Sequence, residues 1–222
     1  MGPTTFLTCA LCARQFPPEF RYVCPECGPT GLLDFHYDYT AARASLEQLQ
    51  RHPTPRGLAR YASVLPVQGP ESLPGLLVGG TPLTPAASLG LPRLFLKEDN
   101  RNPTASFKDR ASAVAIGVAR DLHQPLITGA STGNAASSLA GLCASVGIRT
   151  VIFVPAAAPE AKVAQLLVYG ATVLLVEGSY DDAFELSLEA TRRFGWYNRN
   201  TGYNPTCLEG KKTVSQIGRA HV

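Results

Sequence analysis

Between residues 79 and 216 the chain alternates short apolar runs with longer segments in which apolar residues recur at helical spacing. The apolar runs at residues 94–97, 125–129, 150–154 and 171–176 predict strands. The longer segments predict helices at residues 107–122, 134–146, 160–169 and 181–194, with a further helix from about residue 208. The strands lack polar alternation, which is typical of a parallel sheet buried on both faces. Right-handed crossovers then predict a three-layer α/β fold with helices on both faces of the sheet.

Two of the predicted helices begin with the pattern of a capping box. In this pattern a serine side chain caps the helix and an acidic residue three positions later completes the pair. Ser179 and Asp182 have this spacing at one helix. Ser106 and Asp109 have it at another, directly before a strongly apolar segment. We therefore expect a capping box at both helix starts.

The pattern is different before residue 79. Residues 36–78 are rich in proline, which disfavours long regular elements. One short segment, residues 39–49, has the composition of a helix. We interpret residues 36–78 as a connecting region between the α/β part, residues 79–216, and a separate N-terminal segment, residues 1–35.

The N-terminal segment contains two pairs of cysteines with the spacing of metal-binding knuckles. The pairs are Cys9 with Cys12 and Cys24 with Cys27. Two such knuckles supply the four thiolates of a tetrahedral zinc site, so the spacing predicts a zinc-ribbon-like segment. The segment has too few apolar residues to fold without such a staple, which favours a structural role for the zinc. Free thiols are the alternative.

The composition restricts the class of protein. The chain has 222 residues, of which 45% are hydrophobic and 17% charged, so a packed core is expected. The formal net charge of +3 is too small to indicate a nucleic-acid or anionic-membrane partner. No apolar run approaches the roughly 20 residues that span a bilayer. The N-terminus lacks the pattern of a secretory signal, so we expect a cytoplasmic location and no disulfide framework.

Residues 102–110 read Asn-Pro-Thr-Ala-Ser-Phe-Lys-Asp-Arg and join the first of these strands to the first helix. Lys108 falls in the first helical turn, where the macrodipole disfavours a cation by about 0.3–1 kcal/mol. A lysine held against an apolar helix is typical of amines that form Schiff bases. The local pattern fits a solvent-facing lysine behind a capping box equally well.

The motif resembles the lysine motif of the threonine synthase family, pyridoxal-phosphate (PLP) enzymes of the tryptophan synthase β-like group, fold type II. The segments at residues 79–83, 96–99 and 131–134 are also similar to that family, and the resemblance runs from about residue 9 to residue 216. It implies that Lys108 holds PLP as a Schiff base. It also implies a lyase that converts O-phospho-L-homoserine and water into L-threonine and phosphate. Some members of the family carry a similar N-terminal ribbon.

The resemblance implies further site residues. The loop of Ser131, Thr132 and Gly133 is similar to the one that binds the substrate carboxylate, and Asn134 matches a residue that contacts the cofactor. Taken alone, this loop reads as an ordinary helix N-cap turn. Lys211 and Lys212 lie in a segment that is similar to one near the cleft and are candidates for binding a substrate phosphate. A solvated helix face is an equal alternative for these two lysines.

The family pattern continues beyond this chain, with a glycine-rich loop that grips the cofactor phosphate. We therefore expect the N-terminal part of a PLP-enzyme fold, inactive alone, with an exposed apolar patch near the C-terminal helices. A full-length protein is expected to form a homodimer. Residues 217–222 match a translated sequencing-adapter oligonucleotide. We interpret them as a non-native tail that does not continue the preceding helix, and His221 is therefore not a ligand.

Two other classes of function remain open. Related PLP lyases, such as threonine or serine dehydratase and cysteate synthase, use a similar lysine loop. A zinc-ribbon module that binds nucleic acid is the non-enzymatic alternative, and the near-neutral charge argues against it.

Overall fold

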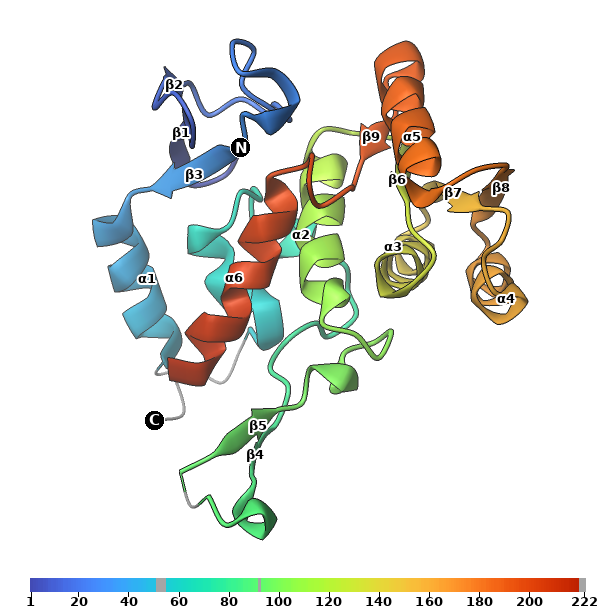
Figure 1. Cartoon of the computed structure of the whole chain (residues 1–222). Helices are drawn as coiled ribbons and strands as arrows, with labels where there is room; N and C mark the ends of the chain where they lie inside the picture. The colour runs from blue at the N-terminus through green and yellow to red at the C-terminus, as the bar shows by residue number, and fades with distance from the viewer. Residues whose placement is uncertain (51–54, 92, 220–222) are drawn as a thin grey trace.

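The computed structural model describes residues 1–50, 55–91 and 93–219 (Figure 1). A small antiparallel sheet comes first, in the order β2-β1-β3. Its strands are β1 (Thr4–Cys9), β2 (Gln15–Phe16) and β3 (Leu33–Tyr37). The sheet has its own small core, which contains Leu7, Leu33 and Phe35 together with buried cysteines. β3 crosses the boundary that the sequence predicted after residue 35.

Short elements dominate the connecting region, as its prolines predicted. Helix α1 (Tyr39–Gln50) confirms the one helix expected there. Two 3-10 turns lie in this region, η2 (Gly57–Val64) and η3 (Pro70–Ser72). Outside it are η1 (Gly28–Thr30), η4 (Ala87–Leu89) and η5 (Asp99–Arg101).

Strand β5 (Phe95–Lys97) corrects the prediction for residues 94–97. It does not join the parallel sheet but pairs antiparallel with β4 (Leu83–Pro85) as a separate ribbon. The ribbon projects from the rest of the molecule (Figure 1). Phe95 is 49% exposed and Leu96 51%, so both faces of β5 are accessible. An apolar run therefore did not indicate burial at this position.

The parallel sheet confirms the predicted α/β fold. Its order is β8-β7-β6-β9, and each neighbouring pair is parallel. The strands are β6 (Leu126–Ala130), β7 (Arg149–Pro155), β8 (Thr172–Val176) and β9 (Tyr197–Asn198). The connecting helices are α3 (Asn134–Ser145), α4 (Glu160–Val168) and α5 (Tyr180–Phe194). The two-residue strand β9 was not predicted.

Alternating side chains on the central strand β7 divide the sheet into two packed faces. Val151 and Phe153 belong to a cluster with residues of α5. Ile152 and Val154 belong to a second cluster with residues of α3 and α4. Figure 1 shows α5 on one side of the strands and α3 and α4 on the other. The predicted three-layer arrangement is confirmed.

Helices α2 (Lys108–Asp121) and α6 (Thr206–Arg219) lie side by side next to this unit (Figure 1). Their close approach requires Gly210, because a Cβ atom there would lie 2.1 Å from the carbonyl oxygen of Arg110. The prediction that residues 217–222 do not continue the helix is wrong for Ile217 to Arg219, which are helical. Residues 220–222, and with them His221, lie outside the described residues.

The two predicted capping boxes have different outcomes. At α5 the box is confirmed, because Ser179 Oγ accepts from the Asp182 N–H at 3.2 Å and the Asp182 carboxylate accepts from the Ser179 N–H at 2.7 Å. At α2 it is wrong. There Ser106 Oγ accepts from the Lys108 N–H at 3.0 Å, and the Asp109 carboxylate instead accepts from the Thr104 N–H at 2.7 Å.

A buried ion pair joins α2 to the turn that precedes it. Arg110 is 0% exposed, and its Nε and Nη2 donate to the two carboxylate oxygens of Asp99 at 2.7 and 2.8 Å. Arg110 Nη1 also donates to Thr213 Oγ1 of α6 at 3.1 Å. Burial acts to raise the pKa of Asp99, but the hydrogen bonds from Arg110 and Thr81 and the charges of Arg110 and Lys97 outweigh it and hold that pKa below its usual value.

Exposed apolar side chains meet the expectation of a C-terminal patch only in part. Helices α5 and α6 expose Leu186, Phe194 and Leu208. Others lie away from these helices, on the β4–β5 ribbon and at the sheet edge formed by β8, where Leu174 and Leu175 are exposed. Within the described residues, no helix is both long enough and apolar enough to span a membrane.

The Arg110–Asp99 pair predicts how stability depends on pH. We expect Asp99→Asn to lower the free energy of unfolding by about 3–5 kcal/mol, because it leaves a buried guanidinium without its anion. A carboxylate with a lowered pKa contributes stability above its unfolded-state pKa and loses it as pH falls. The gap between wild type and variant should therefore be constant near neutral pH and shrink below about pH 4.

Urea denaturation at several pH values measures this gap. Asp34→Asn, at an exposed position of β3, is the matched control and should change stability by less than about 0.5 kcal/mol. Equal effects of the two substitutions would contradict the role given to the ion pair.

Candidate active site

The loop before α2 is held rigidly by its own side chains. Asn102 Oδ1 accepts from the Gly79 N–H at 2.8 Å, and Asn102 Nδ2 donates to the Asp99 carbonyl at 2.8 Å. Ala105 has a φ of 56°, a left-handed conformation that few residues other than glycine adopt. Asp109 also accepts from the Thr104 hydroxyl. These contacts fix the point at which α2 begins.

Lys108 is the first residue of α2, and its side chain is partly buried. Its amine lies 5.3 Å from the ring centroid of Phe107. Among the described residues, no ion pair to Lys108 is found. The neighbouring Arg110 is occupied by Asp99, so Lys108 is the cation of this turn without a carboxylate partner.

A hydrogen bond between two buried serines relates Lys108 to Asn134. Ser138 Oγ of α3 donates to Ser112 Oγ of α2 at 2.8 Å. Ser112 lies one turn after Lys108, and Ser138 lies one turn after Asn134, so each pair shares a helix face. One helical turn rises about 5.4 Å. The contact therefore joins α2 and α3 at a point one turn after Lys108 and one turn after Asn134.

The loop from Ser131 to Asn134 presents free backbone donors. Ser131 Oγ accepts from the Gly133 N–H at 3.2 Å, and Gly133 is the N-cap of α3. Within the described part of the chain, the N–H groups of Thr132, Asn134 and Ala135 have no recorded acceptor. Free amides at a helix N-terminus favour an anion. The Asn134 side chain is exposed beside them.

A second polar loop, residues 198–204, lies against the carboxyl end of β6. The Arg199 N–H donates to the Thr128 carbonyl at 2.8 Å, and Asn200 Oδ1 accepts from the Ala130 N–H at 2.8 Å. Asn200 Nδ2 also donates to Ser187 Oγ at 2.7 Å. This network joins the loop to the start of the segment that carries Ser131. Ligand sites of parallel sheets lie at this edge.

The structure separates the two candidate lysines of α6. Lys211 is partly buried, and its pKa is lowered first by burial and then by the positive charges of Arg199 and Lys108, against an opposing contribution from Cys207. Lys211 therefore lies near Lys108. Lys212 instead donates to Glu209, and its amine is 4.4 Å from the Tyr37 ring centroid of β3. The charges of Lys211 and Lys108 thus affect each other, whereas Lys212 is directed toward the N-terminal sheet.

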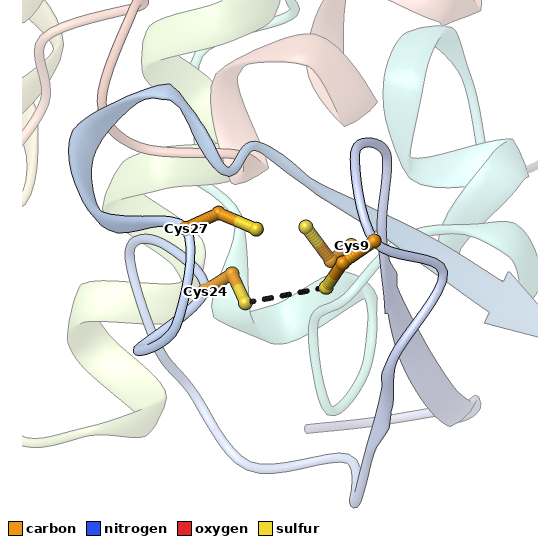
Figure 2. Close-up of side chains that lie close together, drawn as sticks. Cys9, Cys24 and Cys27 are labelled. Atoms are coloured by element: carbon orange, nitrogen blue, oxygen red, sulfur yellow. Dashed lines mark hydrogen bonds between the residues drawn. The ribbon is translucent and has the colours of Figure 1, made fainter.

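The four predicted metal ligands come together in the N-terminal sheet. The sulfur atoms of Cys9, Cys12, Cys24 and Cys27 all lie within 4.8 Å of one another. Figure 2 shows the sulfurs of Cys9, Cys24 and Cys27 turned toward a common centre. The Sγ atoms of Cys12 and Cys24 are 3.8 Å apart.

This arrangement fits a tetrahedral metal ion. Thiolates about 2.3 Å from a tetrahedral zinc ion lie about 3.8 Å from one another, which is the separation of Cys12 and Cys24. The backbone N–H of Cys12, despite the opposing effect of burial, lowers the pKa of Cys9 to about 7, so one thiolate forms readily. A thiol-only set favours zinc over calcium or magnesium.

Aromatic side chains connect this ribbon to the polar loop. Tyr22, two residues before Cys24, accepts from the Asn198 N–H through its Oη at 2.8 Å. Its ring stacks on Tyr203 with centroids 4.4 Å apart. Burial raises the pKa of Tyr22, so its hydroxyl stays protonated. The ribbon thereby packs against the loop that lines the candidate site.

Sequence reasoning missed the side chains that assemble this site from within. Ser112, Ser138, Arg199 and Asn200 are all buried. The only available signal was a polar residue inside an apolar helix, or a polar loop after a short apolar run. Neither pattern says which distant residue is the partner.

The two asparagines near the loop are expected to differ in their effect on stability. Asn200→Ala should lower the free energy of unfolding by about 1–3 kcal/mol, because it leaves the buried Ala130 N–H without its acceptor and removes a hydrogen bond to the Ser187 hydroxyl. Asn134→Ala, at an exposed position, should change it by less than about 0.5 kcal/mol. Thermal and urea denaturation of both variants measure this, and a larger loss for Asn134→Ala would contradict the assignment.

Comparison with known proteins finds a family match that includes the candidate site. The sequence pattern of the family described as pyridoxal-phosphate dependent enzyme matches residues 75–216. Threonine synthase of Methanocaldococcus jannaschii is 34% identical over 213 residues, which cover 93% of this chain and 52% of the relative. Threonine synthase of Methanosarcina acetivorans is 36% identical over 214 residues, or 94% of this chain and 51% of the relative. The chain thus spans about half the length of these curated relatives.

Solved structures are similar in fold. The processed form of threonine deaminase isoform 2 from Solanum lycopersicum has a TM-score of 0.57 and 22% identity, over 64% of this chain and 40% of that one. Maize serine racemase has a TM-score of 0.57 and 24% identity, over 64% of this chain and 44% of that one. The family match covers more than half of the 222 residues and includes Lys108 and both loops of the candidate site. The chain belongs to the family of pyridoxal-phosphate dependent enzymes.

Proposed function

We propose that this chain is the lysine-bearing part of a threonine synthase, which converts O-phospho-L-homoserine and water into L-threonine and phosphate. The observation that carries the proposal is the position of Lys108. Among the described residues it begins α2 without a carboxylate partner, and the Ser112–Ser138 contact joins its helix to α3 one turn after Lys108 and one turn after Asn134, which supports a shared site. The names of these two curated relatives support the choice of substrate.

The residues of the site fit the cofactor. When bound, PLP supplies an electron sink for bonds at the substrate's α carbon. Lys108 Nζ provides the amine that holds the cofactor and then moves protons at the α and β carbons. Asn134, exposed at the start of α3, orients the cofactor ring. Ser131, Thr132, Gly133 and the free amides around them bind the substrate carboxylate.

Lys211 is the residue of α6 that we assign to the phosphate of the substrate. Burial and nearby positive charges lower its pKa, so an anion at this position would be stabilised by several cations at once. Lys212 was an equal candidate in the sequence. We leave it out of the proposal because its amine is already bound to Glu209 and lies against Tyr37.

A dehydratase that acts on threonine or serine is the second candidate. The similarity of fold to a threonine deaminase agrees with it as well as with the first. The two reactions differ in the leaving group, which is phosphate in one and hydroxide in the other. The positive charges of Arg199 and Lys108, which are close enough to lower the pKa of Lys211, support the phosphate-bearing substrate.

For the ribbon we propose a structural zinc ion held by Cys9, Cys12, Cys24 and Cys27. The sulfur spacing and the all-thiol ligand set support zinc. Four protein ligands leave no open position on the metal, which supports a structural rather than a catalytic role. The contacts of Tyr22 with the α/β part support packing within the chain over nucleic-acid binding.

Reductive trapping tests the role of Lys108. Incubation with excess PLP followed by borohydride makes the link between the cofactor and its lysine permanent. We expect one label per chain, on the peptide that contains Lys108, read by mass spectrometry. Lys108→Ala should abolish the label, because the proposal gives the Schiff base to the Lys108 amine, at the start of the helix that the Ser112–Ser138 contact joins to α3.

Lys162→Ala, at an exposed position of α4, is the matched control and should keep the label. Lys211 is the informative competitor, since its pKa is also lowered. Label on Lys211 in place of Lys108, or label that persists in Lys108→Ala, would refute the assignment.

Metal analysis tests the ribbon. We expect one zinc per chain, lost in Cys24→Ser, because removal of one thiolate opens the tetrahedral set. Loss of the metal should unfold the N-terminal sheet, since structural zinc contributes directly to folding. Cys143→Ala, at a buried position of α3 away from the ribbon, is the control and should keep the zinc. A folded wild-type ribbon free of metal would rule the proposal out.

A further inference from the structure

Arg199 is a buried cation for which the described part of the chain provides no counterion. Its side chain is 3% exposed and follows β9 at the carboxyl edge of the parallel sheet. Arg199 Nε donates to Ser112 Oγ at 3.1 Å and Nη1 donates to Thr201 Oγ1 at 3.3 Å. Nη2 is buried and has no hydrogen-bond partner among the described residues. Both partners that it does have are neutral hydroxyls.

Arg110 is a buried arginine with a carboxylate partner, and it provides the comparison for Arg199. It is equally inaccessible, but both oxygens of the Asp99 carboxylate accept from it. Within the described residues no carboxylate pairs with Arg199 in this way. Burial of an unpaired guanidinium is costly, and proteins retain such groups where an anion completes them. An anionic ligand would supply the partner that Arg199 lacks among the described residues.

The contacts of Arg199 relate it to Lys108. Arg199 Nε contacts Ser112, which is on the same face of α2 as Lys108 and one turn further along. The same Ser112 hydroxyl accepts from Ser138 of α3. Arg199 thus reaches the contact that joins α2 and α3, one turn after Lys108 and one turn after Asn134. Lys211 is near enough for the charge of Arg199 to affect it, so a second cation adjoins the orphan guanidinium.

We propose that Arg199 is a phosphate-binding residue of the active site, and that its free Nη2 edge donates to the oxygens of a phosphate monoester. The inference rests on the proposed function, to which it adds a residue and a ligand class. A doubly charged phosphate matches Arg199 and Lys211 in charge, and guanidinium groups recognise its oxygens through several donors at once. The phosphate belongs to the substrate or to the cofactor.

Calorimetric titration of the chain with inorganic phosphate, at fixed ionic strength, tests the assignment. Arg199→Gln should weaken phosphate binding at least about tenfold, because it removes the charge and the free donors. Arg199→Lys keeps the charge without the planar fork and should retain part of the affinity. Lys162→Gln removes one exposed cation on α4 and should leave the affinity unchanged.

Thermal unfolding provides a second measurement that does not depend on one variant. Phosphate should raise the Tm of the wild type and of Arg199→Lys, and sodium chloride at the same ionic strength should not. Equal phosphate affinities for the wild type and Arg199→Gln would overturn the proposal, as would the lack of any phosphate effect on the wild type.

Titration after PLP has been fixed by borohydride distinguishes the two sources of the phosphate. If inorganic phosphate still binds and still requires Arg199, the ligand is the substrate's phosphate. If the fixed cofactor removes this binding, the ligand is the cofactor's own phosphate. Either result supports phosphate recognition by Arg199. Failure of Lys108 to take the label, with Arg199-dependent phosphate binding intact, would refute the proposed function and leave this inference standing.

Discussion

The buried ion pair between Arg110 and Asp99 is the interaction on which the arrangement of this protein depends. It joins the turn η5, the helix α2 and, through Thr213, the helix α6. Lys108 lies two residues before Arg110, so the pair that anchors α2 also fixes the start of the helix and the direction of its first side chains. Gly210 allows α6 to reach the same backbone. The loop that carries Lys108 is thus held by the Arg110–Asp99 ion pair, and neither of these two residues is proposed to bind the substrate or the cofactor.

The two buried arginines differ in role: Arg110 stabilises the fold, and Arg199 is proposed to bind a ligand. Arg110 is completed by a carboxylate from its own chain, and it stabilises the folded state whether or not a ligand is present. Arg199 is completed only by neutral hydroxyls. The difference is visible only in three dimensions, because Arg110 lies in the first turn of α2 and Arg199 directly after β9, and neither local pattern identifies the partner. The position of Arg199 at the carboxyl edge of the sheet agrees with where parallel sheets bind ligands.

The sequence predicted the elements that its periodicity determines and missed those that depend on distant partners. The parallel strands at 126–130, 149–155 and 172–176 and their helices lie within one or two residues of the predictions. Residues 94–97 were assigned to the wrong sheet, because an apolar run does not reveal which strand will pair with it. The motif located Lys108, and the cysteine spacing located the ribbon. The partners of Ser112 and Arg199 come from segments 26 and 87 residues apart, which no local pattern encodes.

The ribbon and the candidate site are mechanically linked, although they are separate in sequence. Tyr22 is two residues from Cys24, and its hydroxyl accepts the backbone N–H of Asn198, the residue directly before Arg199. The stacking of Tyr22 on Tyr203 holds the far end of the same loop. Whatever fixes the cysteine knuckle therefore also restricts the loop that carries Arg199. Ordering that loop costs conformational entropy, and contacts made by the ribbon offset part of that cost before a ligand arrives. This gives the N-terminal segment a physical role in the site without placing any of its residues in contact with the substrate.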